Sequence, residues 1–450
     1  MTSDWKSTLQ NIKLPSARDE QAREDEFLSF EDTITVKREA LERSLRQTLA
    51  EVEELFRENR WQDALAIIYP IDQTAPELVE AGLDIELRAK AAFALGQINR
   101  FDEAIEQLSI CVVREPQNFL HHSSLAYTAY NSLYAASNKE ILLRGKLRLQ
   151  RIALAHEHFK KAQELRPDGV TNFYRQGMLY ARIERKSDKA IPLFEKAVAN
   201  WESLDEEGKK ARVRERKNYV KALYQLASVL LDKGLAKRAL ELLNRCIAND
   251  EDTHYMSQIY KYFALGKIYY HLNKFKEARQ ALEFALTCES ERPVDFVYEL
   301  LARSLLAMGE PRAARQVIER VSKKKRKPYY RWTEADILCA LQRFPEARKA
   351  LLESAERDNR SRHKALIRLA KLEYLLGNFK ESKDYARAAG KFVNQTWGGF
   401  LDDAAFWEAV NCYRMQEHEK ARELARELKE RNPRYPRLHL LLARLDHSTR

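Results

Sequence analysis

The stretch "YFALGKIYY" (262–270) is followed, two residues later, by "NKFKEARQALEFALTCES" (273–290). The first segment places an aromatic residue, a Leu–Gly pair and a tyrosine on one face of a helix. In the second, Ala278 is followed by a long apolar residue after four positions and by a small residue after seven. Small residues let two antiparallel helices pack closely, and large residues fill the space toward the next pair. The stretch therefore predicts a helix–turn–helix unit.

The same pattern recurs along the chain, for example in "NRFDEAIEQLSICVVREP" (99–116), "GEPRAARQVIERV" (309–321) and "QRFPEARKALLESA" (342–355). We count ten units from about residue 41 to the end. The small residue that anchors each unit is Ala64, Ala104, Ala155, Ala190, Ala239, Ala278, Ala314, Ala347, Ser382 or Ala421. One such unit cannot bury its apolar face alone, so the units are expected to stack into an array.

This pattern strongly resembles the tetratricopeptide repeat, W-x2-L-G-x2-Y followed by A-x3-F and then P. The resemblance implies an all-α, right-handed superhelical solenoid over residues 41–450, about ten repeats long, with a C-terminal capping helix. Insertions near 135–152 and 200–219 interrupt the spacing, and we expect the first of them to lengthen its helices. The N-terminal segment 1–35 is polar and acidic, and we expect it to be disordered.

The composition limits the class of partner and the compartment. The net charge is +11, while the first 60 residues contain more Asp and Glu than Lys and Arg, so the remaining chain is strongly basic. A basic protein attracts acidic peptides, nucleic acid or lipid headgroups. The five cysteines are too widely spaced for a disulfide framework or a zinc site, which suits a reducing compartment. Because the sequence has neither a signal peptide nor a membrane-spanning apolar run, we expect a cytoplasmic protein, or a nuclear one if the source is eukaryotic.

No motif for catalysis is present. The chain lacks a phosphate-binding glycine loop, a dinucleotide-binding fingerprint, H-E-x-x-H and G-x-S-x-G. The histidine pairs His121–His122 and His156–His158 lack the i, i+4 spacing that places two metal ligands on one helix face. We therefore predict a protein that is not an enzyme and that needs no cofactor or metal.

In tetratricopeptide arrays the first helix of each repeat lines a concave groove. The resemblance therefore implies a groove that is both aromatic and basic in this chain. Its predicted ligand-binding residues are Tyr127, Tyr130, Tyr174, Arg182, Lys221, Tyr224, Phe263, Lys267, Tyr270, Arg303, Tyr329, Trp332, Lys371, Tyr374, Phe406, Tyr413 and Arg414. Asn131, Met178, Ser228, Glu299, Asp336 and Ile367 share the same register. The alternative is that several of these rings pack between helices.

Two basic clusters lie outside this register. The stretch "VSKKKRKPYYRW" (321–332) contributes Lys323, Lys324, Lys325, Arg326 and Lys327, and "KKARVRER" (209–216) contributes Lys209, Lys210 and Arg212. We interpret the first cluster as a solvated turn before a helix that begins at Pro328. A basic partner patch is the second interpretation and a nuclear import signal the third. The basic clusters, with stacking aromatics, also keep RNA binding open.

The sequence thus favours a scaffold, adaptor or assembly factor that binds acidic, aromatic-containing peptide segments of one or more proteins. An RNA-associated helical-repeat protein is the alternative, and a structural subunit of a larger assembly is the second. The chain's own segment "DEQAREDEFLSFED" (19–32) has the complementary chemistry, either as an occupant of the groove or as a solvated tail. The sequence does not determine the oligomeric state.

Overall fold

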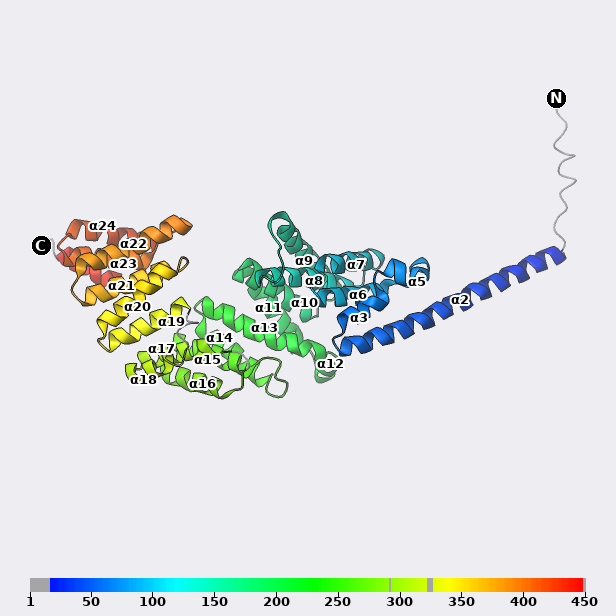
Figure 1. Ribbon diagram of the computed structural model, residues 1–450, viewed down its shortest axis with the longest axis horizontal. Coiled ribbons are helices and arrows are strands. Elements are labelled where there is room, and N and C mark those ends of the chain that lie inside the picture. Colours follow the sequence, from blue (N-terminus) through cyan, green and yellow to red (C-terminus); the bar gives the residue numbers. More distant parts are fainter. Residues whose placement is uncertain (1–16, 291–292, 322–326, 448–450) are drawn as a thin grey trace, which may run out of the picture. The chain divides into compact units, whose positions relative to one another are not determined.

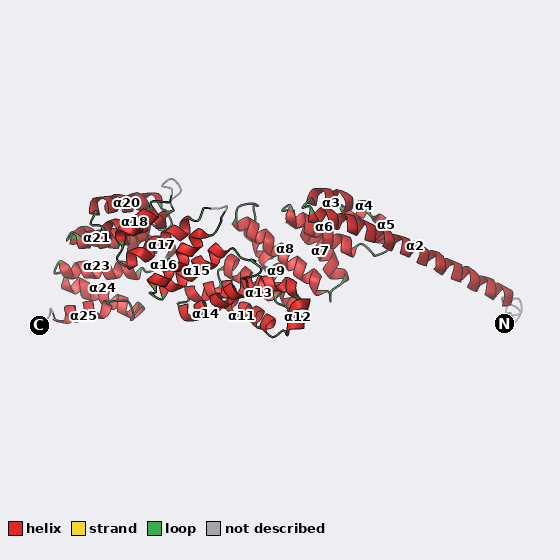
Figure 2. Cartoon of the chain, turned by 90° about the horizontal axis from the view of Figure 1, so that it is seen from below, coloured by secondary structure: helices red, strands yellow, loops and turns green. Residues whose placement is uncertain are grey.

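The computed structural model describes residues 17–290, 293–321 and 327–447, and side chains from residue 35 onward. These residues form helices and loops without strands, so the all-α prediction is confirmed (Figure 2). The chain divides into two compact units, residues 1–229 and residues 230–450, which we call unit 1 and unit 2. None of the described helices is long and apolar enough to cross a membrane.

Consecutive helices pack against each other in pairs, as repeats of this kind require (Figure 1). In unit 1 the pairs are α2 (Ala17–Arg57) with α3 (Trp61–Ile68), α6 (Ile85–Gln97) with α7 (Phe101–Arg114), α8 (Phe119–Ser137) with α9 (Gly145–Leu165), and α10 (Thr171–Met178), extended by the π-helix η2 (Leu179–Glu184), with α11 (Ser187–Glu202). Short helices α4 (Ile71–Thr74), α5 (Pro76–Glu80) and α12 (Glu206–Ala211) connect them.

The division between the units falls within α13 (Val213–Asp232), and α14 (Ala236–Ala248) follows it. In unit 2 the pairs are α15 (Gln258–His271) with α16 (Phe275–Thr287), α17 (Asp295–Ala307) with α18 (Pro311–Ile318), α19 (Pro328–Ala340) with α20 (Phe344–Arg357), α21 (Arg362–Leu375) with α22 (Phe379–Trp397), and α23 (Asp402–Arg414) with α24 (His418–Arg431). The helix α25 (Leu438–His447) ends the described chain.

The predicted anchor residues lie where the helices approach most closely. All ten, from Ala64 to Ala421 and including Ser382, are completely buried. A Cβ atom on Gly266 would lie 2.6 Å from Leu282 Cγ, and one on Gly177 would lie 2.6 Å from a Phe194 ring carbon. Because real Cβ atoms do not come so close, only glycine permits these helix contacts. The small–large pattern of the sequence therefore corresponds to the packing of the helices.

The C-terminal helix closes the core, as the sequence predicted. Leu438, Leu441 and Leu445 of α25 are buried against Ala425 and Leu428 of α24. Without α25, Ala425 and Leu428 of the last repeat would face water. Repeat arrays avoid such exposure with a capping helix.

The N-terminal segment differs from its prediction. Residues 17–35, for which we expected no regular structure, form the beginning of α2, while residues 1–16 lie outside the described residues. The segment contains many Ala, Glu, Arg and Leu residues, which have high helix propensity. Leu41 and Leu45 pack against the core of unit 1, so the helix that they anchor can extend toward the N-terminus.

The two insertions also have defined structure. The segment 135–152 spans the end of α8, a loop and the start of α9, and these helices contain 19 and 21 residues. Most other helices of the array contain 13 or 14. The segment 200–219 contains the end of α11, the whole of α12 and the start of α13.

A buried ion pair fixes the start of α15 in unit 2. Lys261 Nζ lies 2.8 Å from Asp250 Oδ2, and the two side chains are 2% and 0% exposed. The Asp250 carboxylate also accepts hydrogen bonds from Thr253 Oγ1 and from the backbone N–H groups of Tyr255 and Met256. This pair orients the helix that carries three of the predicted groove residues.

Candidate partner-binding site

In unit 1 the first helices bring five predicted residues together. Tyr127 and Tyr130 lie on α8, Tyr174 on α10, Arg182 on η2 and Lys221 on α13. A sixth member, Arg175, was not predicted from the sequence, and its guanidinium carbon lies 3.6 Å from the centre of the Tyr127 ring. We call these six residues the tyrosine–arginine cluster. Tyr224, also predicted, is partly buried on α13.

The tyrosine–arginine cluster is positively charged and partly removed from water. Burial lowers the pKa of Arg175, and burial together with Lys217 and Arg175 lowers the pKa of Lys221. Burial raises the pKa of Tyr174 to about 12, and it also raises the pKa of Tyr130. The phenols therefore stay protonated at neutral pH and can donate hydrogen bonds, beside guanidinium and ammonium groups.

In the first repeats of unit 2 the predicted cations already contact acids or rings. Lys267 Nζ lies 3.1 Å from Asp232 Oδ1. The Arg303 guanidinium carbon lies 4.6 Å from the centre of the Tyr270 ring, and Arg303 Nε lies 3.9 Å from Glu299 Oε1. A carboxylate ligand would have to compete with these partners.

Several predicted rings pack between helices, as the alternative interpretation held. Trp332 is 8% exposed and donates its Nε1–H to Ser354 Oγ at 3.1 Å. Tyr130 and Phe406 are 8% and 9% exposed. Phe263 packs edge-on against Phe296, and the Tyr329 hydroxyl donates to Tyr330. These rings support the first helices, and only part of their surface could reach a ligand.

The last repeats form an aromatic cavity of about 320 Å³, which we call the C-terminal pocket. Four predicted residues line it: Tyr374, Phe406, Tyr413 and Arg414. The remaining lining residues are Trp407, Val410, Arg437, Leu440, Leu441 and Arg444. Among the described residues, the lining therefore contains four aromatic rings and three arginines but no carboxylate.

Arg414 is held in place at the edge of this pocket. Its guanidinium carbon lies 4.4 Å from the centre of the Phe379 ring, and its Nη1 donates to the Tyr374 hydroxyl at 3.3 Å. Neither partner neutralises the charge. Lys371 lines a second cavity, of about 340 Å³, whose lining includes Asp336 and Asp403 and is therefore mixed in charge.

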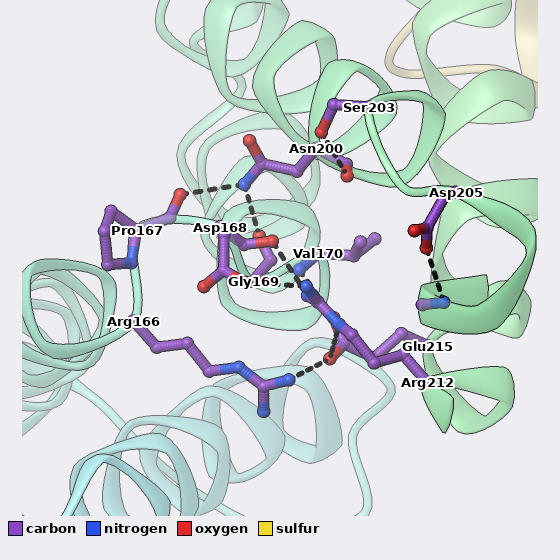
Figure 3. Close-up of polar contacts among 11 residues, drawn as sticks. Arg166, Pro167, Asp168, Gly169, Val170, Asn200, Ser203, Asp205, Arg212 and Glu215 are labelled. Atoms are coloured by element: carbon purple, nitrogen blue, oxygen red, sulfur yellow. Dashed lines mark hydrogen bonds and ion pairs between the residues drawn. The ribbon is translucent and has the colours of Figure 1, made fainter. Parts of the chain in front are cut away.

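Two members of the basic cluster at residues 209–212 form ion pairs with acids of the chain. Figure 3 shows the Arg212 guanidinium between two acids: its Nη1 lies 2.7 Å from Asp168 Oδ2, and its Nη2 lies 3.1 Å from Glu215 Oε2. Glu215 also accepts the backbone N–H of Val170, so this network ties the α9–α10 turn to α13. Lys209 pairs with Glu206 at 2.9 Å, and Lys210 is exposed.

The basic cluster of residues 323–327 is described only at its last residue. Lys323, Lys324, Lys325 and Arg326 lie outside the described residues. Lys327 is exposed and precedes α19, which begins at Pro328 as the sequence predicted. Proline suits this first helical position because its missing N–H would have no partner there.

The histidines form a pair that the sequence spacing did not indicate. His122 Nδ1 lies 2.8 Å from His158 Nδ1, which joins α8 to α9, and His122 Nε2 lies 3.0 Å from the Pro116 carbonyl oxygen. Over the described ranges, no group of three or more His, Cys, Asp or Glu residues has an arrangement suited to a metal ion. The contacts of this pair are thus those of helix packing.

The residues that the sequence missed lie one position beside the predicted register or outside it. Arg175 follows Tyr174, and Trp407 follows Phe406. Arg437 and Arg444 belong to the capping segment, to which we assigned no groove positions. A signal was available for the capping segment, since Arg437 and Arg444 are seven residues apart, a spacing that places two residues on one face of a helix. For Arg175 the deciding contact is with Tyr127 on another helix, and local sequence does not encode it.

The fold and these clusters define an all-α helical-repeat protein. A family model described as a tetratricopeptide repeat-like domain matches residues 210–376. Over these residues the match agrees with the resemblance to the tetratricopeptide repeat that the sequence shows. A comparison with curated proteins finds no match.

Among solved structures, the chain is similar to the apo form of RapI, with 14% identity over 79% of this chain and 99% of that chain and a TM-score of 0.51. It also matches yeast Tom70, with 15% identity, 90% and 96% coverage and a TM-score of 0.40. A tetratricopeptide repeat protein from Thermus thermophilus matches with 17% identity, 46% and 92% coverage and a TM-score of 0.33. At these identities the likeness to RapI concerns the fold alone.

Proposed function

We propose that the chain is a non-enzymatic scaffold or assembly factor whose first helices bind acidic, aromatic-containing segments of protein partners. The observation that carries this proposal is the C-terminal pocket. As far as the chain is described, its lining combines aromatic rings and three arginines without a carboxylate. A segment that brings its own acidic and apolar side chains would complement both features.

The chemistry of the pocket favours a peptide. Aromatic and arginine side chains dominate the binding energy of many protein interfaces. Tyrosine and tryptophan bury a large area at a low cost in conformational entropy, and arginine forms charge-assisted hydrogen bonds. A cavity of about 320 Å³ can take one or two side chains, while the rest of the segment would lie along the first helices. Each hydrogen bond between an arginine of the pocket and a carboxylate of the segment would contribute about 1.5–3 kcal/mol to the binding free energy.

Nucleic acid is the weaker candidate. Of the described members of the basic clusters, Arg212 and Lys209 already pair with acids. The rings at Tyr130, Trp332 and Phe406 are largely buried, so they present little free surface on which a base could stack. A cytoplasmic location is part of the proposal, since a reducing compartment suits five cysteines that form no disulfide within the described residues.

The test is affinity capture from native extract treated with nuclease. The full chain is compared with the variant Arg414→Gln/Arg437→Gln, which removes two charges from the pocket, and with Arg426→Gln/Arg434→Gln. The second variant removes the same charge from exposed positions that do not line the pocket. We expect protein partners that the wild-type chain and the control capture and the pocket variant loses. Equal capture by all three chains would contradict the proposal.

A further inference from the structure

We propose that the exposed end of the α8–α9 hairpin docks on an anionic lipid surface and so holds the chain at a membrane without spanning it. We call this end, residues 134–150, the hairpin tip. It covers most of the insertion at 135–152, and none of its residues is a predicted groove position. The proposal therefore goes beyond the proposed function and does not depend on it.

Four large apolar side chains of the hairpin tip face water. Leu142 is 76% exposed and Leu149 is 66% exposed, and Tyr134 and Leu147 are also exposed. Single exposed leucines are common on protein surfaces and need no explanation. A group of them at the end of one hairpin is typical of a surface that contacts a protein or a membrane.

The exposed leucines are held outward by a neighbour that packs inside. Leu143 is buried in a core cluster that includes Leu133, Leu179 and Ile183. Arg148 Nη2 also donates to the Ile183 carbonyl oxygen at 3.5 Å. These contacts fix the loop between α8 and α9 to the body of unit 1. The tip is thus a preformed surface, and little conformational entropy would be lost when it binds.

The hairpin tip is also strongly basic. Its cations are Lys139, Arg144, Lys146 and Arg148. Glu140 is its one acid, so four cations and one acid leave a net charge of +3. Within the described residues, Arg144 and Lys146 are exposed and form no ion pair. The first turn of α9 contains no acid, and the positive end of its helix dipole adds to the same field.

Acids on the neighbouring helices are already paired with other cations. Asp102 of α7 forms an ion pair with Arg151, one turn beyond the tip. Glu184 Oε1 of η2 lies 2.6 Å from His156 Nε2, and Glu184 also pairs with Lys186. The positive charge of the tip is therefore left for an anion from outside the chain.

The combination of leucines and cations favours a lipid surface over nucleic acid or an acidic peptide. Leucines cannot stack on bases, whereas they can enter the boundary between lipid headgroups and acyl chains. Each Lys or Arg near an anionic membrane raises the affinity by about fivefold. A peptide would fit a groove better, and the two cavities described above lie in unit 2.

The experiment measures flotation of the full-length chain with vesicles in a density gradient at physiological salt. One set of vesicles contains equal parts of phosphatidylcholine and phosphatidylglycerol, and the other contains phosphatidylcholine alone. Leu142→Ser/Leu149→Ser removes two apolar side chains of the tip, and Arg144→Gln/Lys146→Gln removes two of its charges. Because all four side chains are exposed, both variants should keep their helices, which circular dichroism checks.

Each tip variant has a matched control in unit 1. Val113→Ser/Leu120→Ser removes two exposed apolar side chains, from the end of α7 and the start of α8. Lys160→Gln/Lys196→Gln removes two exposed charges from α9 and α11. These controls separate the effect of the tip from that of exposed apolar area or net charge in general.

We expect the wild-type chain to float with the anionic vesicles and not with the neutral ones. Arg144→Gln/Lys146→Gln should lower the partition coefficient by about 20- to 30-fold, and Leu142→Ser/Leu149→Ser by about tenfold. Both controls should float like the wild-type chain. Anionic vesicles should also slow the hydrogen exchange of backbone amides in residues 138–149.

Three results would overturn the inference. The first is no flotation with anionic vesicles, or equal flotation with both sets. The second is wild-type flotation of either tip variant, which would place the lipid contact elsewhere on the chain. The third is an RNA oligonucleotide or polyglutamate that binds the wild-type chain more tightly than the vesicles do and loses affinity in Arg144→Gln/Lys146→Gln. That result would make nucleic acid or an acidic protein the occupant of the tip.

Discussion

Replacing Asp250 by alanine should destabilise unit 2 by about 3–5 kcal/mol, the usual cost of removing one partner of a buried ion pair. The change leaves the ammonium group of Lys261, 2% exposed, without its counter-charge, and two backbone N–H groups without their acceptor. Lys261→Met should cost less, about 1.5–3 kcal/mol, because the carboxylate keeps its other three hydrogen bonds.

Urea denaturation followed by circular dichroism measures these costs. Glu283→Ala is the control, since Glu283 pairs with Arg279 on the surface, where such a pair contributes about 0.3–0.5 kcal/mol. The double variant Asp250→Ala/Lys261→Met should cost less than the sum of the single variants, because the pair can be lost only once. A cost below about 1 kcal/mol for Asp250→Ala, or strict additivity of the two single variants, would show that the ion pair does not stabilise unit 2.

The remaining predictions concern acid stability, helix contacts, thiols and nucleic acid. Burial opposes ionisation of Asp250, but hydrogen bonds from Lys261, Thr253 and two amides outweigh it and lower the pKa of the carboxyl. The ionised carboxylate should therefore contribute its full stabilisation above about pH 4, and this contribution should be lost as the pH falls through the lowered pKa. Asp250→Ala should lack this loss when its free energy of unfolding is measured against pH. Gly266→Ala should lower the free energy of unfolding by about 1–3 kcal/mol, because its Cβ would meet Leu282. Gly96→Ala, whose Cβ would have no atom within 4 Å, should be neutral or stabilising. Equal melting temperatures of the two variants would contradict the packing of Gly266 against Leu282. Burial raises the pKa of Cys111 to about 11 and that of Cys246 to about 12, so a thiol reagent should label both only after unfolding, and labelling of the native chain would show that these helices open. A random RNA oligonucleotide should bind more weakly than about micromolar at 200 mM salt, and tighter binding would favour the nucleic-acid alternative.

The sequence predicted the repeats because their packing is local. Ala278 and Leu282 lie one helical turn apart, and Gly266 meets Leu282 across a short turn, so the spacing of small and large residues records the contact. The extension of α2 to Ala17 was missed because residues 17–35 carry no apolar period, and their helix depends on propensity and on anchoring farther along.

The candidate site was predictable in composition but not in detail. The register placed Lys267 and Trp332 on the first helices, yet Lys267 pairs with Asp232, 35 residues away, and Trp332 turns inward to Ser354. Arg175 was overlooked because its environment comes from Tyr127, which belongs to the preceding repeat. Which face of a side chain is covered depends on contacts between repeats, and these become visible only when the helices are placed in space.

Crosslinking of a captured protein partner to the full chain, with mass spectrometry of the linked peptides, tests most directly whether the first helices bind the partner. The chain carries partly or fully exposed lysines on first helices, at Lys221, Lys267 and Lys371, and exposed lysines on second helices, at Lys160, Lys276 and Lys349. A partner bound along the first helices should crosslink predominantly to the first set. Crosslinks concentrated on the second set would contradict the proposed binding surface.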